Sequence, residues 1–190
     1  MSTSTYVTIE QYQKMAAEGV FSGDDKRRVE LIRGEICEMS PMNLRHIMTI
    51  SAFNFWCVEM AKQAGFQLLV QCPIRIEGLD SEPEPDFAWI HGQEYAKAPA
   101  AADTVLVIEV ADTTLSKDRG EKSTLYAESG IQEYWIVNLQ AETIEVHREP
   151  VGNAYRSVHS FAGDDAIAPL VAPDARLVPG ELFATLPRQE

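Results

Sequence analysis

An acidic residue lies in the middle of an apolar segment, "VLVIEVADTT", at residues 105–114. The pattern predicts a strand buried on both faces, and alternation would place Glu109 on one face together with Val105, Val107 and Ala111. An ionised carboxylate alone in an apolar layer costs several kcal/mol. We therefore expect Glu109 to be neutral, ion-paired or bound to a cation.

A second carboxylate is predicted to lie near Glu109. Asp86 follows Pro85 and opens another apolar segment, "DFAWIHG". If these two strands are neighbours, the carboxylates of Asp86 and Glu109 converge, and they repel each other unless a cation lies between them. Because oxygen-only ligands suit Mg²⁺ or Mn²⁺ better than Zn²⁺, the pair predicts a site for one of these hard cations.

Lys122 lies on the helix expected directly after the strand of Glu109. Its ammonium group could fold back over the strand end and hold a phosphate oxygen or orient a water. Two acids, a lysine and a hard cation together form a phosphodiester hydrolysis site. The residues alone leave structural alternatives open: Glu109 in a salt bridge, Asp86 as a strand or turn start, and Lys122 solvated beside Asp118.

The surrounding segments predict a mixed sheet with helices packed on it, an α/β or α+β fold of two or three layers. A strand, a helix and a strand follow one another from residue 104 to 139, which indicates a parallel βαβ crossover. The predicted helices span 8–19, 43–64 and 116–129, the predicted strands 66–77, 86–92, 104–112, 132–139, 143–149 and 155–161, and a hairpin spans 27–39. The tail from 167 to 190 is expected to wrap around the fold and to end in an apolar anchor, "LFATL".

Length and composition set limits on the class of protein. A chain of 190 residues with 45% apolar residues fits one globular domain, residues 1–190. The formal net charge of −13 opposes general attraction to nucleic acid. Three cysteines without CxxC spacing argue against disulfides and zinc. The sequence shows no membrane span or signal peptide, so we expect a cytoplasmic protein.

Three quoted segments resemble the Uma-two family of restriction-endonuclease-like proteins, in the PD-(D/E)XK nuclease superfamily. They are "PD" at Pro85-Asp86 opening a strand, "IEVAD" after it, and "KDRGEKSTLYAESGIQEYWIV". The upstream "VELIRGEICEMSPMNLRHIM" resembles the family's N-terminal hairpin and the start of its long helix. The similarity covers roughly residues 8–138, with a weaker match at "VPGELF".

The resemblance implies a restriction-endonuclease-like core, with Asp86 and Glu109 as ligands of Mg²⁺ or Mn²⁺ and Lys122 as the catalytic lysine. The superfamily usually has a lysine two positions after the acid, and alanine stands there at position 111. The role therefore passes to Lys122, which is displaced in the resembling family in the same way. Glu30 corresponds to a family acid that could assist the site, with an exposed hairpin glutamate as the alternative. His46 corresponds to a family histidine that could contact substrate or the site, with local packing at the helix start as the alternative.

Further expectations concern other polar residues. Arg119 could bind a substrate phosphate from the first turn of its helix. A basic groove could form from Arg75, Lys117, Arg119 and Lys122. We expect His91, His147 and His159 at the surface and the acids Glu77, Asp80, Glu82 and Glu84 in a solvated loop. Alternation would put Tyr134 and Trp135 on opposite faces of their strand, with at least one in the core.

Two functions remain open from the sequence. The first is a divalent-metal-dependent endonuclease that hydrolyses phosphodiester bonds in DNA. The second is a catalytically silent module with the nuclease fold, which binds a basic protein or a structural cation; the charge of −13 and Ala111 favour it. We also expect a homodimer, for which the exposed edge of the C-terminal strands is one possible surface.

Overall fold

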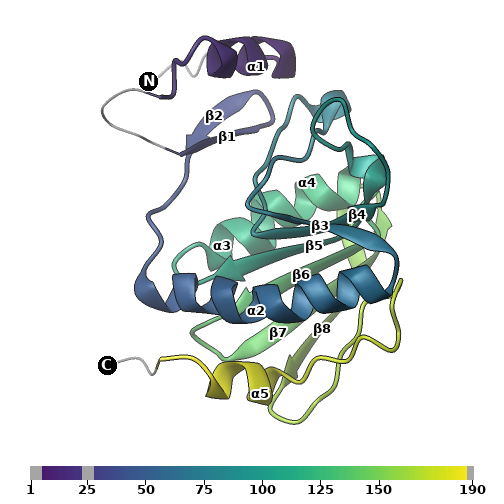
Figure 1. Cartoon of the computed structure of the whole chain (residues 1–190). Coiled ribbons are helices and arrows are strands. Elements are labelled where there is room, and N and C mark those ends of the chain that lie inside the picture. The colour runs from purple at the N-terminus through teal and green to yellow at the C-terminus, as the bar shows by residue number, and fades with distance from the viewer. Residues whose placement is uncertain (1–5, 23–27, 188–190) are drawn as a thin grey trace.

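A six-stranded mixed sheet forms the centre of the fold (Figure 1), in a computed structural model that describes residues 6–22 and 28–187. The strands lie in chain order, and within the described residues β5 and β6 form its parallel pair while all other neighbours are antiparallel. They are β3 (Phe66–Val70), β4 (Phe87–His91), β5 (Thr104–Ala111), β6 (Glu133–Asn138), β7 (Thr143–Val151) and β8 (Ala154–Ala162). The predicted mixed α/β fold is confirmed.

The crossover between β5 and β6 is helical but not one regular helix. It consists of α3 (Leu115–Lys117), a π-helical turn (Asp118–Lys122) and α4 (Ser123–Glu128). It ends at Gly130, whose φ of +81° suits a residue without a side chain. The predicted parallel βαβ crossover is confirmed, and the π turn within it was not foreseen.

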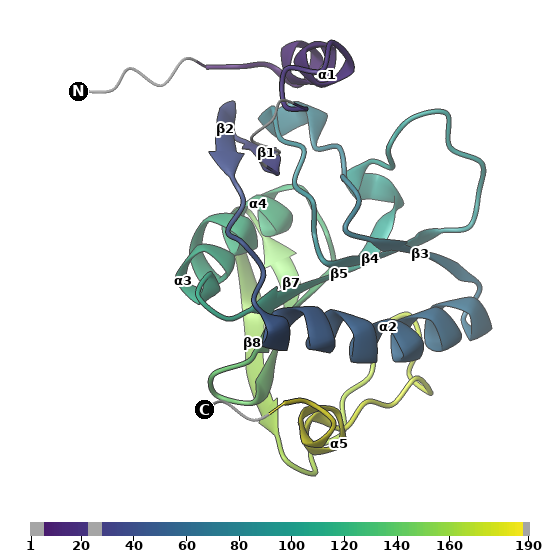
Figure 2. The same cartoon turned by 60° about the vertical axis from the view of Figure 1, so that its left-hand side comes forward.

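The opposite face of the sheet is covered by α2 (Leu44–Gln63), which Asn43 caps by accepting a hydrogen bond from the backbone N–H of His46 (2.9 Å). Figure 2 shows α2 beneath the sheet, with α5 (Pro179–Ala184) on its other side. Phe53 and Cys57 of α2 are fully buried against the aromatic side chains of the sheet. The predicted C-terminal anchor is confirmed, because Leu182, Phe183 and Leu186 are buried in the same cluster.

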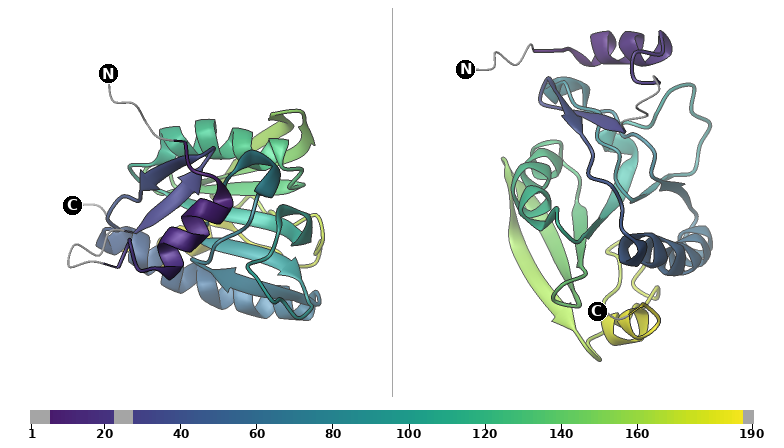
Figure 3. Two further views of the ribbon diagram at one scale, coloured as in Figure 1. Left: turned by 90° about the horizontal axis from the view of Figure 1, so that it is seen from above. Right: turned by 90° about the vertical axis from the view of Figure 1, so that its left-hand side faces the viewer.

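A separate hairpin, β1 (Val29–Ile32) with β2 (Glu35–Glu38), lies beyond one end of the sheet, and α1 (Ile9–Ala17) packs next to it (Figure 3). The two turn residues, Arg33 and Gly34, both have positive φ (49° and 77°), as the tight turns of two-residue hairpins require. The hairpin is fixed to the rest of the chain by paired backbone hydrogen bonds between Leu31 and Glu82. The hairpin therefore lies outside the sheet, at the end where β4 begins and β5 ends.

Some local expectations are corrected by the structure. The strand predicted for 66–77 ends at Val70, because Gln71 adopts φ 49° and Pro73 has no N–H for a ladder. Val105, which was expected on the same face as Glu109, packs instead with the core residues that face α2. The reason is that the pairing register of β4 with β5 shifts between Trp89 and Ile90. His147, which was expected at the surface, is buried at 5% exposure, and Glu82, which was expected in a solvated loop, is buried at 9%. The predicted placement of Tyr134 and Trp135 on opposite faces of their strand is confirmed, and both lie in the core.

Among the described residues, none of the helices has the length and apolar character that crossing a membrane would need.

The C-terminal segment is joined to the sheet by a buried carboxylate. Glu133, fully buried on β6, accepts hydrogen bonds from Trp135 Nε1 (2.8 Å), Arg148 Nη2 (2.6 Å) and the backbone N–H of Leu170 (2.7 Å). We predict that Glu133→Gln lowers the free energy of unfolding by about 3 kcal/mol, because it leaves Arg148 without its charge partner. Glu18→Gln, in the exposed Lys14–Glu18 pair, should cost less than about 0.5 kcal/mol. Urea unfolding measures both, and equal losses would contradict the assignment.

Candidate active site

A cavity of about 260 Å³ lies where β4 begins and β5 ends. Its walls come from the β1–β2 hairpin, the segment that links this hairpin to α2, the N-terminus of α2, the two strand ends, and the α3–π segment. Asp86, Glu109 and Lys122, which the sequence predicts to meet, all line it. Glu30 and His46 line it as well, so five of the six predicted site residues come together.

Glu109 contacts Lys122 directly. Its Oε1 accepts hydrogen bonds from Lys122 Nζ and from Tyr126 Oη, both at 2.8 Å. Burial, together with the nearby Asp118 and Asp86, raises the pKa of Glu109 to about 8 against the opposing effect of Lys122. The contact with Lys122 does not close Glu109 off from the cavity, which the residue helps to line. The pKa of this carboxyl group therefore lies well above that of an ordinary glutamate.

Lys122 is the last residue of the π turn and is only 5% exposed. Burial lowers the pKa of its ammonium group, but Glu109, Glu30 and Asp118 outweigh this effect and raise it above the ordinary value. Its Nζ lies 2.8 Å from Glu109 and 3.4 Å from Glu30. Lys122 therefore stays charged, held between an acid of the sheet and an acid of the hairpin.

Asp86 precedes β4 and is 8% exposed. Its Oδ2 accepts the backbone N–H of Val110 (2.8 Å), which ties it to the strand of Glu109. Its Oδ1 lies 3.2 Å from Gln71 Nε2, a donor, and 3.4 Å from His46 Nε2. Burial raises the pKa of Asp86, but the contact with His46 and the two hydrogen bonds lower it below the ordinary value. Asp86 is therefore an ionised carboxylate at the cavity.

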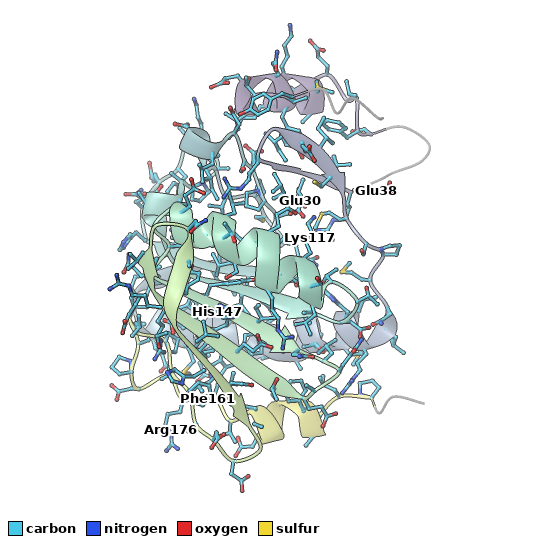
Figure 4. The ribbon with its side chains drawn as sticks, turned by 180° about the vertical axis from the view of Figure 1, so that it is seen from behind. Glu30, Glu38, Lys117, His147, Phe161 and Arg176 are labelled. Atoms are coloured by element: carbon cyan, nitrogen blue, oxygen red, sulfur yellow. The ribbon has the colours of Figure 1, made fainter. Side chains whose placement is uncertain are left out.

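Glu30 brings the hairpin into the site. It is 2% exposed and lies between two lysines, with Lys117 Nζ at 2.9 Å and Lys122 Nζ at 3.4 Å. Figure 4 shows Glu30 and Lys117 near each other between the hairpin and the helical segment. Burial raises the pKa of Glu30, but Lys122 and Lys117 lower it to a net value below the ordinary one. The sequence indicated Lys117 only as one groove residue; its pairing with Glu30 had no local signal.

Arg119 is the predicted site residue that does not join the others. Its guanidinium group contacts Glu145 of β7, with Nε 3.0 Å from Oε2 and Nη2 2.5 Å from Oε1, and it does not line the cavity. Arg75 likewise lies elsewhere and donates to the backbone carbonyl of Ala98. Of the four residues of the predicted basic groove, Lys117 and Lys122 are at the cavity. The π turn explains this division, since Arg119 and Lys122 leave it toward different neighbours.

The carboxylates suit a hard divalent cation in part. Mg²⁺ is usually bound through one or two carboxylates and keeps its remaining positions for water and substrate phosphate. Asp86 and Glu109 supply such a pair, and Glu109 Oε2 accepts no hydrogen bond from the residues that the structure describes. Within those residues, no group of three or more His, Cys, Asp or Glu side chains is arranged to hold a metal ion. Asp86 and Glu109 are thus the residues that would hold such a cation, with its remaining positions left to water and substrate.

Residues 9–180 match the protein-family model described as "Uma2: Putative restriction endonuclease". Among solved structures, the chain is similar to one described as "a putative nuclease belonging to DUF820 from Anabaena variabilis ATCC 29413". The TM-score is 0.71 at 18% sequence identity, covering 94% of this chain and 98% of the other. At this identity the likeness shows a shared fold. A comparison with curated proteins found no significant match.

The raised pKa of Glu109 predicts a specific pH dependence of stability. A carboxyl group with a pKa of about 8 in the folded state and an ordinary value near 4.5 in the unfolded state stabilises the fold fully below pH 4.5. This contribution is lost as the pH rises through 8. We expect the difference in unfolding free energy between wild type and Glu109→Gln to shrink from pH 5 to pH 8.5, because the amide does not titrate. Urea unfolding across this range tests it, and a constant difference would contradict it.

Proposed function

Because the chain belongs to the Uma2 family, described as "Putative restriction endonuclease", we propose that it hydrolyses phosphodiester bonds in DNA with the help of Mg²⁺ or Mn²⁺. The observation that carries the proposal is that Asp86, Glu109 and Lys122 line one cavity. The nuclease function in general has the support of the family description. The cation and the DNA substrate are the parts that this proposal adds.

Each side chain has a distinct role in the proposal. Asp86 and Glu109 would hold the cation, which supplies Lewis-acid polarisation of the phosphate and a lowered pKa for a bound water. Glu109 must release its proton before it can act as a ligand, since its pKa is about 8. Lys122 is charged and stands 2.8 Å from Glu109, where it stabilises negative charge that develops on the phosphate.

Glu30 and His46 act on the other groups in this scheme. Glu30 keeps Lys122 and Lys117 positioned, because its two oxygens contact one ammonium group each. His46 is 16% exposed in its side chain and stands beside Asp86, so it orients the ligand and is within reach of a substrate in the cavity. Arg119 is bound to Glu145 and has no role at the cavity here.

The charge of −13 sets a condition on substrate binding. Acidic side chains outnumber basic ones at the cavity, where Arg28, Lys117 and Lys122 are the basic residues. A phosphodiester therefore meets net repulsion until a cation neutralises part of the acid cluster. We propose that metal binding precedes DNA binding, and that a homodimer presents the site.

Cleavage with defined variants tests the proposal. With Mg²⁺ or Mn²⁺, Glu109→Ala and Lys122→Met should each lower the cleavage rate of duplex or single-stranded DNA by at least about 100-fold, the usual loss for a group that stabilises transition-state charge. Glu128→Gln changes an acid of the same crossover that pairs with Arg33 outside the cavity, and it should cut like wild type. If the wild-type protein leaves DNA uncut, or if all variants cut equally, the proposed nuclease activity is wrong.

Metal affinity separates the nuclease from the silent module. Calorimetry with Mn²⁺ should show binding that Asp86→Asn abolishes and that the exposed control Asp174→Asn leaves unchanged. The affinity should rise from pH 6 to pH 8.5, because ionisation of Glu109 accompanies binding. Absence of binding, with intact folding, would instead favour a module that uses its acidic cleft for a basic protein.

A further inference from the structure

The outer face of α2 carries large apolar side chains in solvent. Phe55 is 75% exposed, Leu44 67%, Val58 49% and Ile47 46%. Figure 1 shows α2 crossing the front of the sheet with no other element drawn in front of it. Scattered apolar residues at a surface need no explanation, but a contiguous row on one helix face marks an interaction surface.

These four residues are arranged symmetrically along the helix. Leu44 and Ile47 stand seven and four positions before Ser51, and Phe55 and Val58 stand four and seven positions after it. Residues at these spacings share one face of a helix. Ser51, small and exposed, lies at the midpoint. If α2 of a second copy packs antiparallel on this face, the large side chains of one copy lie opposite large side chains of the other. The two small Ser51 residues then meet where the helices cross.

The size and charge of the face also fit a second copy of the chain. With Met48, the exposed parts of these side chains amount to roughly 500 Å² per chain, most of the ~800 Å² per partner that a standard interface buries. Residues 46–58 contain no Asp, Glu, Lys or Arg. Two copies that each carry −13 can approach here without placing like charges opposite each other. The face equally offers no charge to a basic protein or to a nucleic acid.

We propose that the protein forms a two-fold dimer by antiparallel packing of α2 against α2 of a second copy, with Ser51 at the axis. In this arrangement Phe55 of each copy lies opposite Ile47 of the other. The dimer surface is thus α2 and not the exposed edge of β8.

A cysteine at the axis tests the arrangement directly. In a Cys37→Ser/Cys72→Ser background, which keeps the buried Cys57, Ser51→Cys should form an intermolecular disulfide under mild oxidation. Val58→Cys is the matched control, since its two copies would lie about 21 Å apart along the helices and a disulfide needs Cα atoms within about 7 Å. Cross-linking of Val58→Cys without Ser51→Cys, or of neither, would overturn the two-fold axis.

Charged substitutions on the outer face of α2 test the same dimer surface without a covalent cross-link. Light scattering should show a dimer for wild type and a loss of affinity of more than about 30-fold for Phe55→Lys or Ile47→Glu. The double variant Ile47→Glu/Phe55→Lys should recover dimerisation, because residue 47 of one copy faces residue 55 of the other. Ile47→Glu/Phe55→Glu should not recover it. Val158→Lys, on the exposed β8 edge, should dimerise like wild type.

Neither the cross-linking nor the light-scattering experiment depends on nuclease activity, because neither contains a metal ion or DNA. A monomeric wild type, or a dimer disrupted by Val158→Lys but not by Phe55→Lys, would overturn the proposal.

Discussion

The contact between Lys122 and Glu109 is the constraint on which the site depends. Both side chains are 5% exposed, so each would be costly without the other. The surroundings contain more acid than base, because Asp86, Glu30 and Asp118 also act on the pair. Burial and this excess of acid both raise the pKa of Glu109.

No single element builds this cluster. Glu109 belongs to a central strand, Asp86 precedes the neighbouring strand, Lys122 ends a π turn, and Glu30 comes from a hairpin outside the sheet. The π turn matters because it changes the rotation of the helix between Lys117 and Lys122, and both lysines reach Glu30. Such turns are rare and are often found at functional sites. The hairpin and the crossover are therefore coupled through one buried carboxylate.

The sequence predicts those features that follow from local patterns. Alternation identifies Glu109 as an acid facing a buried layer, and the strand–helix–strand order places Lys122 near the strand end. The contact between Lys117 and Glu30 spans the hairpin and the crossover, which no periodicity relates. Arg119 shows the same limit, because a π turn rather than a regular helix decides which neighbour it meets. His147 is polar by type, yet it lies on the buried face of β7 beside Tyr134 and Tyr155.

Helix α2 joins the chemistry and the proposed assembly in one element. Its N-terminus supplies His46 and the capping residue Asn43 to the cavity, while Leu44 and Ile47 flank His46 on the exposed face. Its inner side is fixed separately, by Phe53 in the core and by Arg45, which donates to the carbonyl of Leu139 (2.5 Å). A partner packed on the outer face would restrict the first turn of α2 without touching the acids. The first turn of α2 thus carries both His46, which lies beside Asp86, and two residues of the proposed dimer face.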